Sequence, residues 1–411
     1  MTIRIDAERL IPGRGEPITA ATVLLEGRSI LYAGASTEAP ATPPDVESVR
    51  VDTVMPGMWE THAHLWGLDT ANIEALITHD PRVGTLRAAA DLGVLLRAGF
   101  TSVREVGGYG TYLARAIDEG TVVGPSVYSS GAILSQTGGH ADIHGLPIPE
   151  LDALMERHFG APTLCDGPDD CRRLVRRQLR LGARLIKVCA SGGVMSQVDH
   201  PIHQQFTAEE LSAIVDEASR ADRVVAAHCH GKPGIMAAIA AGVKTIEHGS
   251  YLDEEAAEAM MENDVVLVPT RFIVEHLVAQ SRTLNMPDYA RVKIEAIADQ
   301  HRTALEIAIS KGVRIALGTD IFVRSALGSN GRELRHLVDA GMSPLQAIEA
   351  ATANGPLTIG PQAPASGRLL EGFDADVVAV SGDPLADVDL LGDGSAITHV
   401  WKAGRLLHQA G

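Results

Sequence analysis

Aromatic side chains are scarce in this chain. Only 4% of its 411 residues are Phe, Tyr or Trp, so Ala, Val, Leu and Ile must supply most of a core. Hydrophobic residues nevertheless reach 45% and charged residues only 21%, a balance that excludes disorder as the main state. No run of about 18 apolar residues occurs, which predicts that no segment crosses a membrane.

Positive charge is in deficit. The chain carries 35 Lys and Arg against 52 Asp and Glu, which gives a formal net charge of −17. Because such a field repels a phosphate backbone, we expect no nucleic-acid partner. The same charge favours solubility and would help to attract a cationic substrate.

The sequence also has no CxxC pair, and its first residues do not suggest a secretory leader. The four cysteines, Cys165, Cys171, Cys189 and Cys229, form no CxxC motif, so we expect reduced structural thiols rather than a cysteine zinc site. The first nine residues carry acidic side chains and no apolar stretch, which is unlike a signal peptide. These features predict a cytoplasmic protein.

Several catalytic motifs are absent from the sequence. There is no Gly-x-Ser-x-Gly elbow, so serine hydrolysis is disfavoured. There is also no Walker A motif and no GxGxxG, and Gly107–Gly108–Tyr109–Gly110 reads as a flexible loop.

The central part of the chain alternates short apolar runs with helical patterns. One helix is expected from a capping box at Thr207–Glu210, and another over residues 290–311. The expected strands are 53–55 running toward Glu60, 101–104, 126–128, 185–188, 223–226, 244–247, 265–268 and 313–317. Eight strands alternating with helices predict a (β/α)₈ TIM-like barrel.

Both ends of the chain have a different texture of short strands and turns. The runs 21–25, 376–380 and 399–402 are apolar and are separated by Gly, Asp and Pro. Neither end can bury a β-face alone. We therefore predict a small β-sandwich domain built from residues 1–53 plus 358–411, beside a barrel formed by residues 54–357.

Two histidines stand at the end of the first expected barrel strand. Side chains two apart in a strand point to the same side, so His62 and His64 can reach one metal ion. An exposed His-x-His pair would look identical in sequence. The carboxyl end of a barrel strand, where active sites of this fold are built, favours the metal interpretation.

A lysine lies inside an apolar strand. Lys187 stands within Leu185–Cys189, where burial penalises an ammonium charge. A salt-bridged barrel lysine is one interpretation. The other is a neutral amine that has captured carbon dioxide, giving a carbamate that bridges two metal ions.

Three further strand ends carry residues of the metal-ligand type. His228 ends one strand, His248 ends the next, and Asp320 follows Gly318–Thr319. Taken singly, each histidine suits a buried core position, and Asp320 suits a helix cap. Five such strand ends in one barrel instead favour zinc or a similar metal.

The order of these residues resembles that of the amidohydrolase superfamily over nearly the whole chain. The motifs are Met55–Pro56–Gly57–Met58 leading into His62 and His64, then Lys187, His228, His248 and Gly318–Thr319–Asp320. The segment Ala190–Val194, followed by Gln205–Phe206–Thr207, is similar to the imidazolonepropionase-related branch. That branch contains prolidase-like dipeptidases, arginine and lysine carboxypeptidases, and N-acyl amino acid hydrolases.

The resemblance implies a set of roles. Two divalent metal ions, most simply zinc, would be bridged by carboxylated Lys187. His62, His64 and Asp320 would hold one metal, and His228 and His248 the other. Asp320 would also move the proton, and relatives of this kind form homo-oligomers.

Further positions are assigned to substrate. His140, after Gly138–Gly139, is similar to a branch histidine that contacts the substrate carbonyl, and Gly192 and Gly193 would line the substrate site. His230 points the same way as His228 and stands where some relatives carry Tyr, which leaves its catalytic role open. The long loop over residues 132–170 is expected to cover the barrel mouth. His144 and the pair His200 and His203 read as loop residues.

The sequence therefore predicts a binuclear metal-dependent hydrolase of a dipeptide or N-acyl amino acid. Arg271, His276 or Arg282 could bind a substrate carboxylate, although they suit a surface helix better. A cyclic-amide hydrolase would use nearly the same barrel, but its one-metal members lack the lysine. A lactonase or phosphotriesterase would share the lysine, and a non-catalytic binding or assembly protein is a more remote interpretation.

Overall fold

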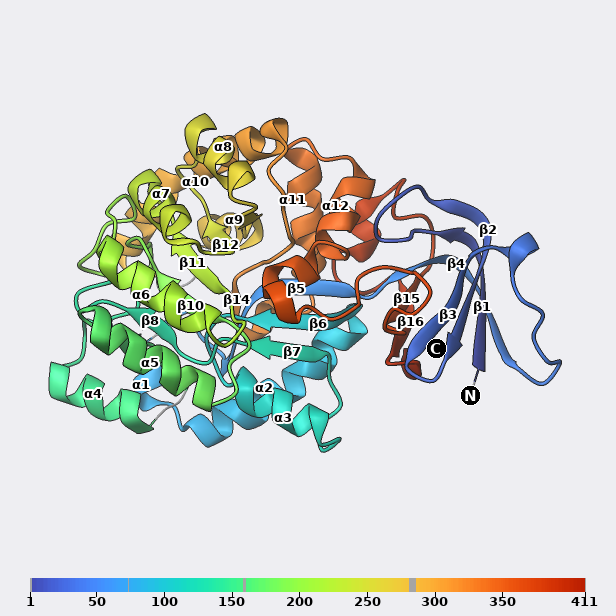
Figure 1. Cartoon of the computed structure of the whole chain (residues 1–411), viewed down its shortest axis with the longest axis horizontal. Helices are drawn as coiled ribbons and strands as arrows, with labels where there is room; N and C mark the ends of the chain where they lie inside the picture. The colour runs from blue at the N-terminus through green and yellow to red at the C-terminus, as the bar shows by residue number, and fades with distance from the viewer. Residues whose placement is uncertain (1, 73, 158–159, 281–285, 411) are drawn as a thin grey trace.

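Figure 1 shows an α/β body with a β-sheet at one end of the molecule, where both chain termini lie. The computed structural model describes residues 2–72, 74–157, 160–280 and 286–410. Within that part of the chain, no helix combines the length and apolar character that a membrane crossing needs.

The terminal sheet joins the two ends of the chain. Its seven strands are ordered β17-β16-β15-β4-β1-β2-β3. They span β1 (Thr2–Leu10), β2 (Ile18–Glu26), β3 (Ser29–Ala35), β4 (Glu47–Pro56), β15 (Val377–Val380), β16 (Ile397–Lys402) and β17 (Arg405–Gln409). Antiparallel pairing of β15 with β4 brings Val378 opposite Met55 and so closes the sheet between the termini. The pairing of the two ends is as expected, but the strands form one sheet and a sandwich of two is not confirmed.

Parallel strands make up the body. One sheet has the order β14-β5-β6-β7, with β5 (Met58–Leu68), β6 (Phe100–Glu105), β7 (Ser126–Ser129) and β14 (Ile321–Val323). The other has the order β13-β12-β11-β10-β8-β9. Its strands are β8 (Ile133–Ser135), β9 (Thr163–Leu164), β10 (Ile186–Cys189), β11 (Val225–Cys229), β12 (Thr245–His248) and β13 (Val266–Val268).

The two parallel sheets do not form one closed ring of strands. Isolated backbone hydrogen bonds bridge the two openings between the sheets. At one, Arg184 N, just before β10, donates to Ser129 O of β7 at 2.8 Å; at the other, Thr61 N of β5 donates to Leu317 O at 2.9 Å. The eighth strand expected over residues 313–317 is not a strand, and only Ile315 forms an isolated bridge, to Leu267. Its ladder is interrupted because Leu317 N donates to Ala350 O at 2.9 Å, beyond the sheet.

Helices pack around these sheets (Figure 1). The longer ones are α2 (Pro81–Arg97), α5 (Pro168–Arg180), α6 (Ala208–Ser219), α7 (Lys232–Ala241), α9 (Arg271–Gln280) and α10 (Asp288–Lys311). The others are α1 (Ala75–Thr78), α3 (Gly110–Asp118), α4 (Ile148–Arg157), α8 (Glu254–Glu262), α11 (Glu333–Asp339) and α12 (Pro344–Ala351). The capping box predicted at Thr207 is confirmed, since its side chain accepts from Glu210 N and the Glu210 side chain bonds back.

The core is aliphatic, as the composition predicts. It includes Leu92, Leu95, Val188, Ile214 and Ile246, all fully or almost fully buried. All four cysteines are free and buried, which fits the structural role expected of them.

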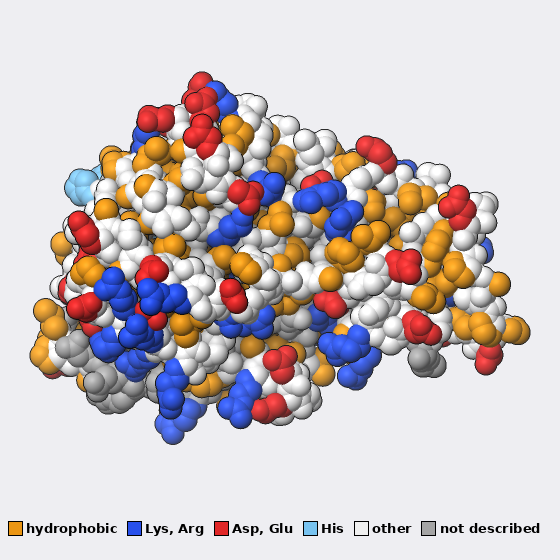
Figure 2. Space-filling model, viewed as in Figure 1, with side chains coloured by type: hydrophobic (Ala, Val, Ile, Leu, Met, Phe, Trp, Pro, Cys, Tyr) orange, Lys and Arg blue, Asp and Glu red, His pale blue; other side chains and the backbone are white. Residues whose placement is uncertain are grey.

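Acidic and basic side chains lie next to one another on the surface drawn in Figure 2. On α5, Arg172 and Arg173 pair with the preceding Asp169 and Asp170, and Arg176 pairs with Glu217 of α6. This pairing is typical of a solvated helix face.

Candidate active site

One cavity collects every residue that the sequence assigned to metal. His62 and His64 lie in β5, Lys187 in β10, His228 in β11, His248 at the end of β12, and Asp320 directly before β14. We call these six residues the polar floor. His140 and His230 line the same cavity.

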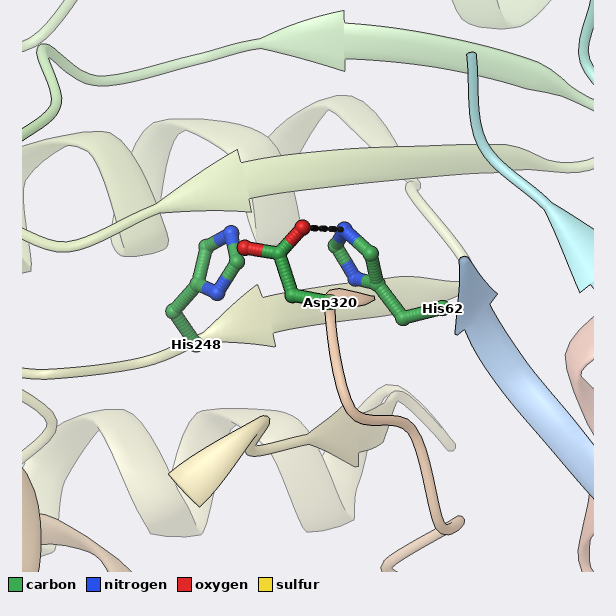
Figure 3. A group of neighbouring side chains, drawn as sticks. All are labelled: His62, His248 and Asp320. Atoms are coloured by element: carbon green, nitrogen blue, oxygen red, sulfur yellow. Dashed lines mark ion pairs between the residues drawn. The ribbon is translucent and has the colours of Figure 1, made fainter. Parts of the chain in front are cut away.

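Three side chains of the polar floor lie within a metal's reach of one another. Ligand atoms of His62, His248 and Asp320 all fall within 4.8 Å, and Figure 3 shows the three converging. Asp320 Oδ1 lies 3.5 Å from His62 Nε2 and 3.2 Å from His64 Nε2. The ring centroids of His228 and His248 are 4.6 Å apart. The two groups of ligands expected from the sequence therefore adjoin each other.

Left-handed backbone occurs at two of these positions. His248 has φ 69° and Asp320 has φ 59°, values that residues with a Cβ rarely adopt. Each stands at the end of a strand or directly before one, where the chain must turn sharply. Strain of this kind is concentrated at functional sites.

Each floor histidine has one ring nitrogen bonded to a group behind it. His62 Nδ1 donates to Glu247 Oε2 at 2.7 Å, and His64 Nδ1 donates to Gly107 O at 2.9 Å. His228 Nε2 donates to Gly192 O at 3.2 Å, and His248 Nδ1 is 2.7 Å from Thr270 Oγ1. The second nitrogen of each ring is thereby left for the cavity, as in metal sites whose ligands are oriented by outer hydrogen bonds.

A buried ion pair supports His62 from below. Arg104 of β6 and Glu247 of β12 are fully buried, and Arg104 Nη2 approaches the two Glu247 oxygens at 2.8 and 2.6 Å. Arg104 also donates to Thr245 Oγ1 at 2.9 Å and to the carbonyl oxygen of Thr61 at 2.5 Å. Because β6 and β12 belong to different sheets, this pair joins the two sheets across the interior.

Lys187 stands apart from this network. Its Nζ is buried and has no hydrogen-bond partner among the described residues. Burial, together with the nearby Arg104, lowers its pKa, although the Glu247 and Asp320 carboxylates act in the opposite direction. A buried amine with a lowered pKa is the chemical form that can react with carbon dioxide.

Four imidazoles of the cavity, those of His62, His228, His230 and His248, are kept neutral. Burial and the nearby Lys187 lower the pKa of His62 to about 4, and burial lowers the pKa of His230 to about 3. The pKa values of His228 and His248 also lie well below the ordinary value, because both rings are buried. Metal binding requires neutral imidazole, so the site is prepared in that protonation state.

Asp320 is charged and held from both sides. Burial alone would raise its pKa, but His62, His64 and Lys187 keep it below the ordinary value. The neighbouring Thr319 is fixed by Glu60, whose Oε1 accepts from Thr319 N at 3.0 Å and from His62 N at 2.8 Å. Glu60 thus connects β5, which carries His62 and His64, to the turn that carries Asp320.

The outer part of the cavity is apolar. Eight of its residues, from β5, β8, α9, α10, β14 and the loop after β10, form what we call the apolar wall: Trp66, Ile133, Val194, Ile273, Leu277, Ile294, Ile297 and Phe322. Among the described lining residues, Lys187 is the only Lys or Arg. This wall suits an uncharged, bulky substituent better than a cationic one, against the expectation from net charge.

The structure also places the residues that the sequence suggested as carboxylate binders or loop residues. Arg271 is turned away from the cavity, where it donates to Ala298 O at 2.6 Å and pairs with Glu275. His276 stacks on Phe272, and Arg282 lies outside the described residues. His200 and His203 are not among the lining residues, and His144 lines a neighbouring cavity. Of the long loop 132–170, Ile133, residues 140–143 and Pro162 contribute to the cavity lining.

The two predicted substrate glycines act through backbone. Gly192 O accepts from His228, and Gly193 N donates to Asp199 Oδ2 at 2.9 Å. A Cβ on Gly193 would come within 2.1 Å of the His140 ring, so this position must be glycine for His140 to sit where it does.

Sequence reasoning missed the residues that stand behind the site. Glu247, Arg104, Glu60, Thr270 and Ser196 were not selected, although Glu247 directly precedes His248 and Glu60 lies two residues before His62. Glu60, Arg104 and Glu247 could have been found because each is a charged residue within an apolar strand. On that criterion only Lys187 was selected from the sequence.

Comparison with known proteins agrees with this geometry. The chain is 45% identical to the ochratoxinase of Aspergillus niger over 421 residues, which cover 99% of this chain and 87% of the relative. The crystal structure of A. niger ochratoxinase has a TM-score of 0.92 at 43% identity and covers 100% of this chain and 96% of that one. A prolidase complexed with N-methylphosphonate-L-proline has a TM-score of 0.93 at 30% identity, with both chains fully covered.

A more distant relative and the family match complete the comparison. The imidazolonepropionase of Streptomyces griseus is 24% identical over 96% of this chain and 94% of the relative. Residues 53–407 match the Amidohydrolase family. The resemblance inferred from the metal-type residues is thus confirmed, and the chain belongs to the Amidohydrolase family as a hydrolase that acts on C–N bonds.

Proposed function

We propose that this protein is a binuclear metal-dependent amide hydrolase that releases the C-terminal amino acid from an N-acyl amino acid or dipeptide. The observation that carries the proposal is the convergence of six residues of the metal-ligand type on the floor of one cavity. Amide-bond hydrolysis is the chemistry for which such a floor, with a carboxylate beside the ligands, is suited.

The residues present fit two metal ions. Lys187 is a buried amine without a partner among the described residues, and a carbamate formed on it would supply the anionic oxygens that two cations share. His62, His64 and Asp320 would hold one ion, and His228 and His248 the other. Nitrogen and carboxylate donors of this kind suit zinc. When bound, the metals would activate water and polarise the scissile carbonyl.

The chain's own groups supply the proton transfers. Asp320 is an ionised carboxylate beside both β5 histidines, so it can take a proton from the attacking water. The same carboxyl group can then deliver that proton to the leaving nitrogen, which matters because an amine leaves poorly without it. His140 and His230, whose rings both contact the ring of His228, are placed to contact the substrate.

The apolar wall narrows the substrate class. A bulky apolar acyl group or side chain would bury its surface against Ile273, Leu277 and Phe322, at about 25 cal/mol per Å² removed from water. The ochratoxinase relative makes ochratoxin a rational test compound. The phosphonate bound by the similar prolidase is tetrahedral at phosphorus, as an amide carbonyl becomes under attack by water, which also favours amide hydrolysis at this site.

We also propose the arrangement that the sequence predicts around this site. Residues 54–357 would form one (β/α)₈ unit and residues 1–53 plus 358–411 a β domain. We expect an intracellular homo-oligomer that acts on small molecules.

The test is amino-acid release from a library of dipeptides, N-acyl amino acids and ochratoxin, with zinc and bicarbonate supplied. Asp320→Asn protein serves as the blank, because it keeps the shape of the side chain and loses the proton acceptor. Release confined to a few C-terminal residues would support the proposal. Silence across the library with two metals bound would contradict amide hydrolysis and would direct the search to lactones, cyclic amides or phosphoesters.

A further inference from the structure

A hydrogen-bonded chain runs from His140 to helix α10. His140 Nδ1 lies 2.9 Å from Ser196 Oγ, and Ser196 Oγ donates to Asp199 Oδ1. Lys293 of α10 places its Nζ 3.4 Å from the same carboxylate oxygen. We call these four residues the His140 relay. Ser196, Asp199 and Lys293 stand outside the predicted catalytic and metal-binding set.

The far end of the relay is firmly anchored. The Asp199 side chain is 5% exposed, and its Oδ2 accepts from Gly193 N at 2.9 Å and from Gln205 Nε2 at 3.1 Å. Lys293 Nζ also donates to the carbonyl oxygens of Gly193, Ser196 and Asp199, at 3.2, 2.7 and 2.5 Å. One lysine therefore fixes both the carboxylate and the loop that carries it.

Asp199 remains a carboxylate in this setting. Burial alone would raise its pKa, but His140, the Ser196 hydroxyl, the Gly193 amide and Lys293 together hold it below the ordinary value. An ionised carboxylate can only accept hydrogen bonds. The single hydroxyl proton of Ser196 is therefore directed to Asp199.

The direction of that bond decides the proton on His140. Since Ser196 Oγ has given its hydrogen to Asp199, it can only accept from the imidazole, so the hydrogen lies on His140 Nδ1. The other ring nitrogen, Nε2, is then left for the cavity that His140 lines.

The ring has little freedom to turn. It stacks on His228 with centroids 4.2 Å apart, and it also lies against Gly193, where no Cβ fits. The backbone of the same residue is held by a 3.0 Å bond from His140 N to Gln205 Oε1. Both the orientation and the proton of His140 are thus set by neighbours.

We propose that Ser196 and Asp199, anchored by Lys293, are positioning residues that hold His140 with its hydrogen on Nδ1 and leave Nε2 for the cavity. The catalytic meaning of this arrangement rests on the proposed amide hydrolysis. The relay then decides which ring nitrogen of His140 can contact the substrate.

The kinetic test uses a double-mutant cycle between Ser196 and His140. Ser196→Ala should lower kcat by at least about tenfold with KM and metal content nearly unchanged, because the ring loses its fixed direction. Ser196→Thr, which keeps the hydroxyl, should restore most of that loss. In a His140→Ala background, Ser196→Ala should have no further effect. Additive losses in the double variant, or equal losses in Ser196→Ala and Ser196→Thr, would overturn the proposal.

A second readout does not depend on the substrate. Nitrogen-15 NMR of protein labelled in histidine reports which ring nitrogen carries hydrogen, and the His140 signals are identified by their loss in His140→Gln. We expect hydrogen on Nδ1 in the wild type and a changed pattern in Asp199→Asn. An Nδ1 that carries no hydrogen would overturn the proposal even if the enzyme hydrolyses amides. A protein with the expected tautomer but no amide hydrolysis would instead refute the proposed function.

Discussion

The polar floor and the apolar wall meet in one cavity but are built in opposite ways. Floor residues come from strands or the turn before β14, and the four floor histidines each bond to a fixed group behind them, as His62 does with Glu247. Five of the eight wall residues come from α9, α10 and the loop after β10, and they are held by apolar packing, as Ile273 and Leu277 of α9 are. The contrast indicates that the reaction is fixed by the strands, while most of the wall belongs to helices and loops that can change with less effect on the reaction.

The largest effect is expected on the floor, at Asp320. Asp320→Asn removes the proton acceptor and should lower kcat by about 10²- to 10⁴-fold, the range for general acid–base catalysis. The measurement is steady-state hydrolysis of the best library substrate, with bound metal counted in the same samples. Activity within about twofold of the wild type would remove Asp320 from the reaction.

The second effect tests how far metal binding by the polar floor depends on the buried Arg104–Glu247 pair behind His62. Glu247→Gln leaves Arg104 as an uncompensated buried charge and weakens the hold on His62. Metal affinity should fall about 10- to 100-fold, and the free energy of unfolding by about 3–5 kcal/mol. Competition with a chelator and denaturant unfolding measure the two losses.

A matched control for Glu247 is available on the surface. Glu217→Gln removes the carboxylate that pairs with Arg176 at 2.8 Å between α5 and α6. This pair is open to solvent on the arginine side, so little change is expected in either measurement. Equal losses in the two variants would show that the buried pair has no special place in the site.

The third effect separates the wall from the floor. Leu277→Ala should raise KM for substrates with a bulky apolar group by about tenfold, since a few methylene contacts are lost. Metal content and kcat for a small acyl substrate should stay near wild-type values. A loss of kcat on small and large substrates alike would mean that the wall also positions the reacting groups.

The smallest effect is the pH dependence of the metal-free protein. Five buried histidines and the partly exposed His140 have pKa values below the ordinary value; the five are His62, His228, His230, His248 and His301. Between about pH 6.5 and pH 4 the unfolded chain binds protons at these groups that the folded chain does not, so stability falls as the pH is lowered.

Four buried carboxyl groups act in the other direction. Burial raises the pKa of Glu60 and of Glu105 to about 7 and that of Glu333 to about 8, and it also raises the pKa of Asp91. Acidification over the same range favours their folded form, but the histidines outnumber them. Tm of the metal-free protein should therefore be lower at about pH 5 than at about pH 7.5, and a higher Tm at the acidic pH would reverse this balance.

Sequence patterns predicted the floor well and the support behind it poorly. His62, His64, His228 and His248 could be predicted because strand ends can be located from apolar runs and turn residues, and Lys187 because it is a charged residue inside such a run. Their partners were not, because Arg104 and Glu247 meet across the interior, and such a meeting depends on how two sheets pack. Pattern alone does not give that geometry.

The fold, too, could be predicted from the sequence in part, well for some strands and poorly for others. The strands that pair in regular ladders, such as β10, β11 and β12, lie close to the predicted runs. The run 313–317 is equally apolar but fails as a strand because Leu317 N bonds to Ala350. The wall was missed for a related reason: the apolar residues of α9 and α10 look like ordinary core in sequence, and only their position beside the cavity distinguishes them.

The most direct test of the binuclear floor is a count of metal ions per chain in wild-type and Lys187→Met protein, each loaded with zinc in the presence of bicarbonate. Lys187 has a buried amine without a partner among the described residues, and it is the residue on which we propose the bridging carbamate. We expect two ions per wild-type chain and fewer than two in the variant. Two ions retained by Lys187→Met, or a single ion in the wild type, would contradict a binuclear floor.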